Sequence, residues 1–292
     1  MSSTESASPR FADIEDWSSQ DLVDGMVESQ FTAIAAVRTA APALSRAIEA
    51  AASRLAHGGR LVYVGAGTSG RIAAQDAAEL PPTFSWPYER AVPVMAGGEP
   101  ALLRAAEGAE DNGEAAKQAL AELGVGSQDV VVALAASGRT PFAIAALVHA
   151  REVGALAIGI FNNPGSKLGE AADLPILLDT GAEFIAGSTR MKAGTAQKAA
   201  LNVLSTGIMI RLGFVYRGKM VEMRPTNVKL QERAVKMVAD LTDSGAEAAR
   251  RMLTEADGSI KLATLMLLKS LTREEAEATL ARARGNLRDA LR

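Results

Sequence analysis

The sequence predicts an α/β protein with an open parallel sheet flanked by helices, N-terminal helices before it and a small C-terminal helical region after it. Two observations predict this fold. Five short apolar runs alternate with helical patterns before Asp179, as buried parallel strands do when crossover helices join them. After Thr189 the pattern turns helical and stays so. Ligands of such sheets bind outside the carboxyl ends of the strands.

The elements follow in chain order. Small aliphatic residues recur at helical spacing over about 18–58, where Gly58-Gly59 ends the pattern. The strand-like runs are "LVYVG", "AVPVMAG", "DVVVALAAS", "ALAIGIFN" and "LPILLD". Helical patterns separate them near 69–80, 100–122, 140–153 and 165–172. The runs are short and continuous, which favours strands buried on both faces.

The C-terminal third is predicted to be helical. One long helix ends near Gly213, a second covers about 226–242, and short amphipathic helices follow. Thr272 and Glu275 have the spacing of a capping box. We therefore expect an N-terminal arm and helix over 1–47, a sheet domain over 48–218 and a C-terminal helical region over 219–292.

Composition excludes several classes of function. The net charge is −3 and no long basic run occurs, so binding driven by nucleic-acid phosphates is not expected. The chain has no cysteine, and its two histidines lack metal-ligand spacing. No signal peptide is recognisable, and the most apolar late segment is too short to span a membrane. We expect a cytoplasmic protein that binds no metal, no nucleic acid and no membrane.

A glycine pattern raises the question of the ligand. Gly65, Gly67 and Gly70 follow the first strand with the spacing of a dinucleotide-binding turn. Such folds carry an acidic residue at the end of the second strand for the ribose, and "AVPVMAGG" ends without one. Thr68 and Ser69 suit a compact terminal phosphate. The motif therefore favours a sugar phosphate over NAD.

Three strand ends combine glycine with hydroxyl or amide groups directly before a helix. Such turns bind anions through backbone N–H groups, although glycine and serine also form ordinary turns. A helix cap is an equal alternative for the residues that begin the long helix, and an exposed salt bridge for Arg139. The candidate substrate ligands are Gly67, Thr68, Ser69, Ser137, Gly138, Arg139, Thr140, Asn163, Glu183, Ser188, Thr189 and Lys192.

Two carboxylates are candidate proton carriers. Glu79 is expected to end the first crossover helix, because Pro81-Pro82 should prevent its continuation. Partial negative charge at a helix C-terminus disfavours ionisation, which suits a general acid. Glu110 lies in "AAEGAEDN", and solvated helix-end charges are the alternative for both residues. Ser69 and Glu79 would lie about 15 Å apart along one helix, so a fold-back or a second subunit would be needed to unite them.

Several segments carry a resemblance to a known family. They are "GAGTSGRIAAQDAAELPPTF", "AGGEPALLRAAEGAED", "ALAASGRTPFAIAAL", "NNPGS" and "GAEFIAGSTRMKAGTAQKAALNVLSTGIMIRLG". In order and spacing they resemble the N-acetylmuramic acid 6-phosphate etherases. The resemblance implies a sugar isomerase (SIS) domain, a homodimer and no metal or organic cofactor. It also implies cleavage of the D-lactyl ether of a cell-wall amino sugar, with Glu79 and Glu110 as the acid/base pair.

Two other functions stay open on the sequence. An aldose–ketose isomerase on the same fold also needs a base near C2 of the sugar, but no acid aimed at an ether oxygen at C3. A non-catalytic sugar-phosphate sensor is the third hypothesis. A sensor that binds DNA should carry a basic helix-turn-helix, and none precedes residue 58.

Overall fold

The computed structural model describes residues 3–225 and 227–292. Residues 1–2 of the expected arm and Thr226 of the expected helix over about 226–242 lie outside the described residues. Contacts divide the chain into two compact units. The first consists of residues 1–78 and 88–205, and the second of 79–87 and 206–292. The sequence-based domain limits of 1–47, 48–218 and 219–292 remain predictions.

All five strand-like runs form one parallel sheet, in the order β2-β1-β3-β4-β5. Its strands are β1 (Leu61–Gly65), β2 (Ala91–Met95), β3 (Val130–Ala135), β4 (Leu156–Phe161) and β5 (Leu174–Leu177). Every residue of the three central strands β1, β3 and β4 is buried, whereas the edge strands β2 and β5 are partly exposed. Continuous apolar sequence therefore marks central position, as expected for a sheet covered on both faces.

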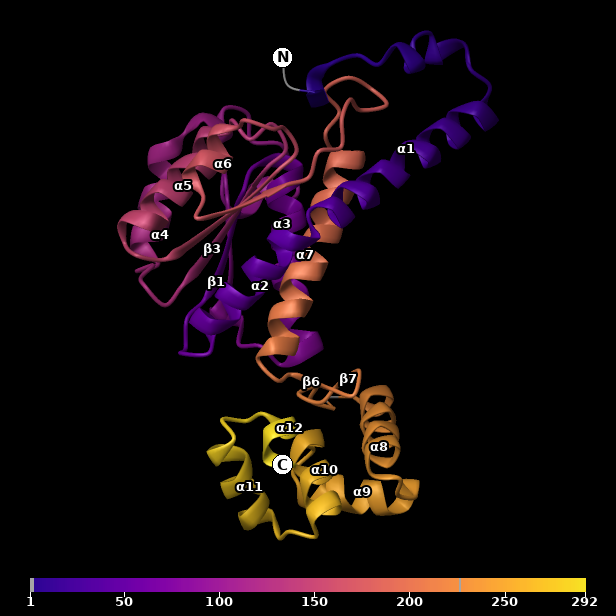
Figure 1. The fold of residues 1–292 in the computed structure, drawn as a ribbon, viewed down its shortest axis with the longest axis vertical. Coiled ribbons are helices and arrows are strands. Elements are labelled where there is room, and N and C mark those ends of the chain that lie inside the picture. Colours follow the sequence, from indigo (N-terminus) through magenta and orange to yellow (C-terminus); the bar gives the residue numbers. More distant parts are fainter. Residues whose placement is uncertain (1–2, 226) are drawn as a thin grey trace. The chain divides into compact units, whose positions relative to one another are not determined.

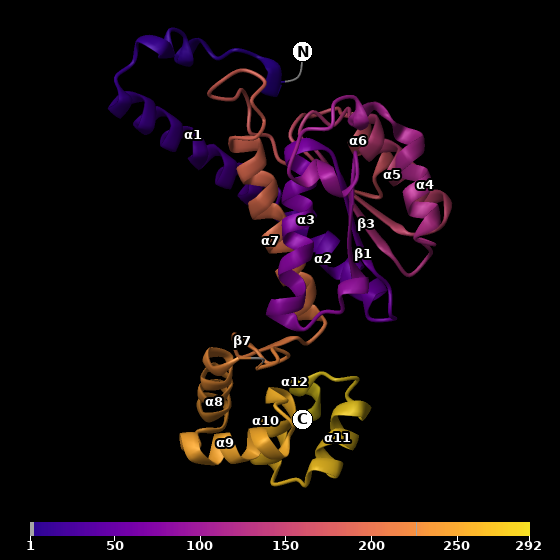
Figure 2. The same ribbon diagram turned by 180° about the vertical axis from the view of Figure 1, so that it is seen from behind.

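Helices cover both faces of this sheet (Figures 1 and 2). One face carries α4 (Gly113–Glu122), α5 (Pro141–Glu152) and α6 (Lys167–Ala171), which close an aliphatic core over β3 and β4. The other face carries α2 (Ala41–Leu55) together with α3 (Gly67–Phe84) and α7 (Lys192–Arg211). The core consists largely of Ala, Val and Leu, so the helices pack close to the strands.

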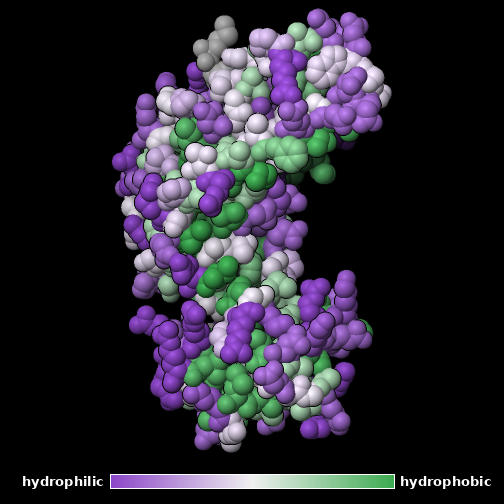
Figure 3. All heavy atoms as spheres, turned by 45° about the vertical axis from the view of Figure 1, so that its right-hand side comes forward, coloured by the Kyte–Doolittle hydropathy of each residue, from purple (hydrophilic) through white to green (hydrophobic). Residues whose placement is uncertain are grey.

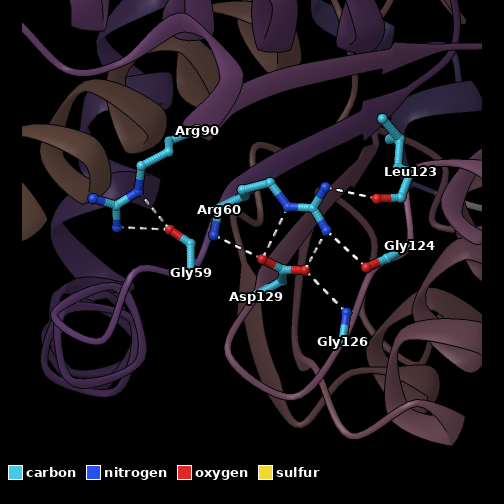
Figure 4. A network of polar contacts seen from close by, with 7 residues as sticks. All are labelled: Gly59, Arg60, Arg90, Leu123, Gly124, Gly126 and Asp129. Atoms are coloured by element: carbon cyan, nitrogen blue, oxygen red, sulfur yellow. Dashed lines mark hydrogen bonds and ion pairs between the residues drawn. The ribbon is translucent and has the colours of Figure 1, made fainter.

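A polar network fastens the amino ends of β1 and β3 (Figure 4). Arg60 directly precedes β1, and its guanidinium forms an ion pair of 2.7 Å with Asp129, which precedes β3. The same guanidinium donates to the carbonyls of Leu123 and Gly124 at 2.6 and 2.9 Å. This end of the sheet is opposite to the carboxyl ends of the strands, where ligands of such folds bind.

The N-terminal helical stretch is two helices. α1 (Ser19–Thr39) and α2 meet at Ala40, and Pro42 occupies the first turn of α2. Proline is tolerated there because the N–H that it lacks has no partner within the helix. Ser18 caps α1, accepting from the backbone N–H of Asp21.

Two sequence predictions fail in the loops. The helix expected over about 100–122 is shorter, since α4 begins at Gly113 and the preceding segment forms only 3-10 turns at Glu99–Leu102 and Ala109–Asp111. The stretch after Thr189 is not helical throughout, because β6 (Val215–Tyr216) and β7 (Lys219–Met220) form a hairpin. Arg217 and Gly218 at its tip both have positive φ, of 45° and 73°, the conformation that a two-residue hairpin turn requires.

The second unit has its own core. Its described residues include the hairpin and the helices α8 to α12, whose apolar faces pack together. The helices are α8 (Val228–Thr242), α9 (Ala246–Glu255), α10 (Ile260–Lys269), α11 (Arg273–Arg282) and α12 (Leu287–Ala290). The predicted capping box at Thr272 and Glu275 is present, so this helix start was readable from the sequence.

Candidate functional site

The turn between β1 and α3 is shaped by its glycines. Gly67 has φ +54°. A Cβ on Gly65 would lie 2.8 Å from the backbone of Gly70, and a Cβ on Gly70 would lie 2.7 Å from the carbonyl oxygen of Gly65. This close packing starts α3 directly after the strand. The unpaired N–H groups of the first helical turn therefore point out of the carboxyl edge of the sheet, where an anion can bind.

The second and third candidate loops follow the adjacent strands β3 and β4 and are fastened together. The backbone N–H of Asn162 donates to the carbonyl of Ala136 at 3.0 Å, and that of Leu168 to the carbonyl of Gly138 at 3.0 Å. A Cβ on Gly138 would lie 2.3 Å from Cβ of Ser166. Glycine at 138 is thus required for the approach of the two loops, whether or not it contacts a ligand.

The second loop offers hydroxyl donors. Oγ of Ser137 accepts from the backbone N–H of Arg139 at 3.1 Å, which leaves the hydroxyl proton of Ser137 for another acceptor. Thr140 is the N-cap residue of α5, yet its side chain makes no capping hydrogen bond. Arg139 is exposed. These groups have the chemistry that a phosphate needs, and their contact with it remains a prediction.

The start of α7 adjoins the turn after β1. A Cβ on Gly194 would lie 3.4 Å from the methyl group of Thr68. Ser188 and Thr189 are half-buried in the turn that precedes α7, and Lys192 is its buried first residue. The candidates at the two helix starts therefore lie close together, as a shared anion site would require.

Glu183 caps α7. Its Oε2 accepts from the backbone N–H of Lys192 at 3.1 Å and its Oε1 from that of Ala193 at 2.9 Å. Burial raises the pKa of Glu183, and the two backbone N–H groups and the Lys192 charge oppose the rise. Burial lowers the pKa of Lys192, opposed by Glu183. Both carboxylate oxygens accept from backbone N–H groups at the start of α7, so helix capping accounts for the buried position of Glu183. Its contact with the sugar stays a prediction.

Asn163 binds the N-terminal segment. Its Nδ2 donates to the carbonyl of Ala136 at 2.8 Å and to Oγ1 of Thr4 at 2.9 Å, and its Oδ1 accepts from the backbone N–H of Thr4 at 3.3 Å. The backbone N–H of Gly187 donates to the carbonyl of Thr4 at 3.0 Å. The segment therefore folds onto the third loop of its own chain. Both amide protons of Asn163 are used inside the protein, and a role in substrate binding remains a prediction.

Glu110 lies on the loop that follows β2. It is exposed, in a 3-10 turn at Ala109–Asp111. Gly65 pairs with Met95 at the ends of the parallel strands β1 and β2, so the loop leaves the same edge of the sheet as the turn at Gly67. The structure thus brings Glu110 to the edge where the phosphate candidates lie.

The prediction that Pro81-Pro82 ends the first crossover helix is wrong. α3 runs on through both prolines to Phe84, and Ser85 leaves it with φ +52°. The φ of proline is itself helical, so the helix can continue at the expense of the backbone hydrogen bonds that the missing N–H groups would have made. Glu79 is therefore exposed and more than one turn before the helix end, where the partial negative charge at the C-terminus acts less strongly on it.

Glu79 is separated from the other candidates within the chain. It lies ten positions after Ser69 on one helix, which corresponds to about 15 Å. Contacts also group Glu79 with the second compact unit, whereas Glu110 and the phosphate candidates belong to the first.

Sequence analysis missed two residues that support the candidate loops. Ser69 Oγ donates to Oε1 of Gln197 at 2.8 Å, and Nε2 of Gln197 donates to Oδ1 of Asn162 at 3.1 Å. Arg71 donates from Nε and Nη2 to the carbonyls of Leu102 and Ala101, at 3.0 and 2.9 Å. Polar residues on otherwise apolar helix faces were the available signal, but their partners are distant in sequence.

The second unit contains an open hollow of about 920 Å³, lined by residues of the hairpin–α8 connection, of α8 to α11 and of the turn between α9 and α10. None of the candidate site residues is among its described lining residues. In residues 3–225 and 227–292, no three acidic or histidine side chains are grouped to hold a metal ion. Within the same ranges, the helices are too short or too polar to cross a bilayer.

Sequence profiles identify the sheet region. The profile of the glucokinase regulatory protein N-terminal SIS domain matches residues 43–151, and the SIS domain profile matches residues 109–207. Among solved structures, a protein involved in capsule formation from Bacteroides fragilis aligns with a TM-score of 0.50. Its identity is 20%, and the alignment covers 68% of this chain and 94% of that one. At this identity the likeness shows the fold alone.

Curated relatives match over nearly the whole chain. An N-acetylmuramic acid 6-phosphate etherase of Deinococcus radiodurans is 49% identical over 288 residues, which are 99% of this chain and 94% of the relative. Proteins of the same name from Salmonella agona and Cronobacter sakazakii are each 44% identical, over 99% of this chain and 97% of the relative. The match therefore includes both compact units.

Proposed function

The chain belongs to the N-acetylmuramic acid 6-phosphate etherase family, and we propose on this premise that it cleaves the D-lactyl ether of N-acetylmuramic acid 6-phosphate. The products are N-acetylglucosamine 6-phosphate and D-lactate, and the reaction serves the recycling of cell-wall sugars. The observation that carries the proposal is the near-full-length match to etherases. The order and spacing of the candidate loops agree with it.

The geometry supports the proposal at the sheet edge. Turns after β1, β3 and β4 supply backbone N–H groups and the hydroxyls of Thr68, Ser137 and Thr140, which suit a monophosphate. The loop of Glu110 leaves the same edge, so a sugar whose phosphate lies in these turns would extend toward a carboxylate.

The reaction needs two proton transfers in the elimination and two more in the hydration that follows. In the open-chain sugar the C2 proton is acidic because it adjoins the aldehyde. Glu110 removes it as general base, and the C3–oxygen bond breaks as Glu79 protonates the departing lactate oxygen. Water then adds to C3 of the unsaturated aldehyde with Glu79 as base, while the proton returns to C2. Each carboxyl group is expected to contribute about 10²–10⁴ in rate. The steps call for no metal or organic cofactor.

A homodimer would reconcile this pair with the fold. Because Ser69 and Glu79 lie about 15 Å apart along α3, the proposal assigns Glu79 of a second copy to each site. α1 offers a surface for association, since Val23, Val27, Phe31 and Ile34 are 51–70% exposed. They lie within about a quarter of the helix circumference, and apolar atoms gather over α1 in Figure 3. Such a stripe marks an interaction site.

The test is incubation with N-acetylmuramic acid 6-phosphate and enzymatic detection of D-lactate. In deuterated water, Glu110→Gln should abolish exchange at C2, whereas Glu79→Gln should retain exchange and lose lactate release. Glu107→Gln is a matched control, because Glu107 is an exposed glutamate on the same loop. Full exchange at C2 in Glu110→Gln would refute the assigned base.

An aldose–ketose isomerase is the rival function. It would convert a sugar phosphate such as fructose 6-phosphate or glucosamine 6-phosphate between its aldose and ketose forms, without releasing lactate. Incubation with these substrates therefore separates the two hypotheses. We assign the protein to the cytoplasm, in keeping with a phosphorylated substrate. We assign it no nucleic-acid or membrane partner.

A further inference from the structure

We propose that Arg71 is a positioning residue that holds the loop of Glu110 against the first turn of α3. This inference rests on the proposed function for its kinetic consequence. Arg71 lies two residues after Ser69. The first turn of α3 therefore contains both Ser69, a candidate phosphate ligand, and the side chain that contacts the loop of Glu110.

The guanidinium binds two consecutive backbone carbonyls. Its Nε donates to Leu102 at 3.0 Å and its Nη2 to Ala101 at 2.9 Å. These carbonyls end the 3-10 turn at Glu99–Leu102. The planar fork of arginine fits two neighbouring acceptors, whereas a lysine ammonium is a flexible point charge. The contact thus fixes both the position and the direction of the chain where it leaves this turn.

The chain beyond this contact is otherwise exposed. Residues 103–108 are all exposed, and Leu103 is 91% exposed. The next anchor is Gly97, two residues after the end of β2, since a Cβ there would lie 2.5 Å from Cβ of Ala106 and 3.4 Å from Cβ of Ala109. Glu110 follows Ala109 directly. Its carboxylate is therefore carried by a segment that packs on Gly97 and, through the turn at Ala109–Asp111, on α5, and that Arg71 holds from α3.

Displacement of a general base lowers the reaction rate rather than the affinity for the substrate. A shift of about 1 Å can lower the rate about 10²-fold. Arg71→Gln should lower kcat for lactate release about 10–100-fold and leave KM within about threefold. Arg71→Lys keeps one donor and should lie between the wild type and Arg71→Gln. The hydrogen-bonded amides of Leu103, Ala109 and Asp111 should exchange with solvent about threefold faster or more in Arg71→Gln.

Arg90 provides a matched control. Like Arg71 it donates to backbone carbonyls, with Nε 2.9 Å from Gly59 and Nη2 2.7 Å from both Gly59 and Leu55 (Figure 4 shows the Gly59 contacts). These contacts lie at the amino end of β1. Arg90→Gln should lower thermal stability and leave kcat and the exchange of the Glu110 loop unchanged.

The outcomes separate the hypotheses. A raised KM with unchanged kcat and unchanged exchange would overturn the proposal and make Arg71 a ligand of the anionic substrate. Equal kcat losses in Arg71→Gln and Arg90→Gln would also overturn it, because a general structural role would then suffice. If the wild type releases no lactate, the proposed function fails, while the exchange comparison still decides whether Arg71 holds the loop. If Arg71→Gln does not fold, Arg71→Lys carries the same test.

Discussion

The hydroxyl of Ser69 donates a 2.8 Å hydrogen bond to Oε1 of Gln197. Residues distant in sequence determine which of the two side chains is the donor. Nε2 of Gln197 donates to Asn162, and Nδ2 of Asn162 donates to the carbonyl of Leu178 at 2.9 Å. A carbonyl oxygen only accepts, so it orients Asn162, which in turn orients Gln197. All three side chains are buried. The relay therefore joins the turn after β1 to α7 and to the ends of β4 and β5.

Gln197→Met should break this relay while filling the same space. The Ser69 donor and the Asn162 acceptor would be left buried without partners, at a cost of about 1–3 kcal/mol in the free energy of unfolding. The rotamer of Ser69 would be released, so KM for the sugar phosphate should rise. Urea denaturation and steady-state kinetics measure the two effects.

Gln118→Met is the control for that substitution. Gln118 lies exposed on α4, where its side chain donates to the exposed Glu122 at 2.8 Å. Its loss should change stability by about 0.5 kcal/mol or less. If both variants lost equal stability, the buried relay would have no special weight.

The strands could be predicted from the sequence because their signal is local. β1, β3 and β4 are buried along their whole length, and each is a continuous apolar run. The glycine-rich loops were also recognisable, since Gly67 and Gly138 have positive φ and glycine is the residue that adopts it without strain. Local chemistry thus located the edge of the sheet where a ligand would bind.

The remaining features depend on contacts between distant segments. No local pattern pairs Ser69 with Gln197 or Asn163 with Thr4, because each pair is separated by more than 120 residues. The prolines at 81 and 82 suggested a helix end by a local rule that α3 overrides. The hairpin at Arg217-Gly218 was missed because its strands have only two residues each.

Glu183→Gln should change how stability depends on pH. Burial raises the pKa of Glu183 in the folded protein above the ordinary glutamate value. Between the unfolded and the folded pKa the folded state holds the proton more often, so stability falls as pH rises through this window and is flat outside it. The slope is at most about 1.4 kcal/mol per pH unit. Glutamine cannot titrate, and the variant should lose this slope.

The measurement is urea denaturation from about pH 4 to 8 at constant ionic strength. Glu170→Gln replaces an exposed carboxylate on α6 and should leave the slope of the wild type. A slope that survives Glu183→Gln would show that another group produces it.

Gly97→Ala should displace the loop of Glu110. Gly97 has φ +84°, and a Cβ there would lie 2.5 Å from Cβ of Ala106. The left-handed conformation costs alanine about 1–2 kcal/mol, and the contact forces Ala106 to move as well. We expect kcat for lactate release to fall about tenfold or more, as for any misplaced base.

Gly58→Ala separates the two causes. Gly58 has φ +94°, and the space within 4 Å of a Cβ there holds no atom of another described segment. Alanine at 58 should therefore lose stability through its backbone conformation alone, without a steric clash. Gly58→Ala should lose about 1–2 kcal/mol in the free energy of unfolding, the cost of the left-handed conformation alone, and its kcat should be unchanged. Equal kcat values in the two variants would mean that the packing over Gly97 does not place the base.

Thr4→Val tests whether the N-terminal segment is held by one side chain. Thr4 is fully buried, and its Oγ1 accepts from Nδ2 of Asn163 at 2.9 Å. Valine keeps the shape and removes that acceptor, which leaves one amide proton of Asn163 buried and unpaired at a cost of about 1–3 kcal/mol. Other anchors of the segment include the Ser3 hydroxyl on Oδ1 of Asn163 at 3.0 Å and the ring of Phe11, 4.6 Å from that of Phe184. With the Thr4 bond lost, the segment should open locally more often than the core unfolds. Trypsin should therefore cleave at the exposed Arg10 faster than in the wild type.

The matched control is Thr39→Val. Thr39 is exposed on α1, and its hydroxyl donates to the carbonyl of Ala35 within the same helix, at 3.1 Å. It should leave both stability and cleavage at Arg10 unchanged. If Thr4→Val also raised KM, the bond between Thr4 and Asn163 would have to keep the third loop in the conformation that binds the substrate. If neither cleavage nor stability changed, the side chain of Thr4 would not hold the segment. The first result would extend the candidate site to the N-terminal segment. The second would show that the other contacts of the segment, such as the Phe11–Phe184 pair, are enough to hold it.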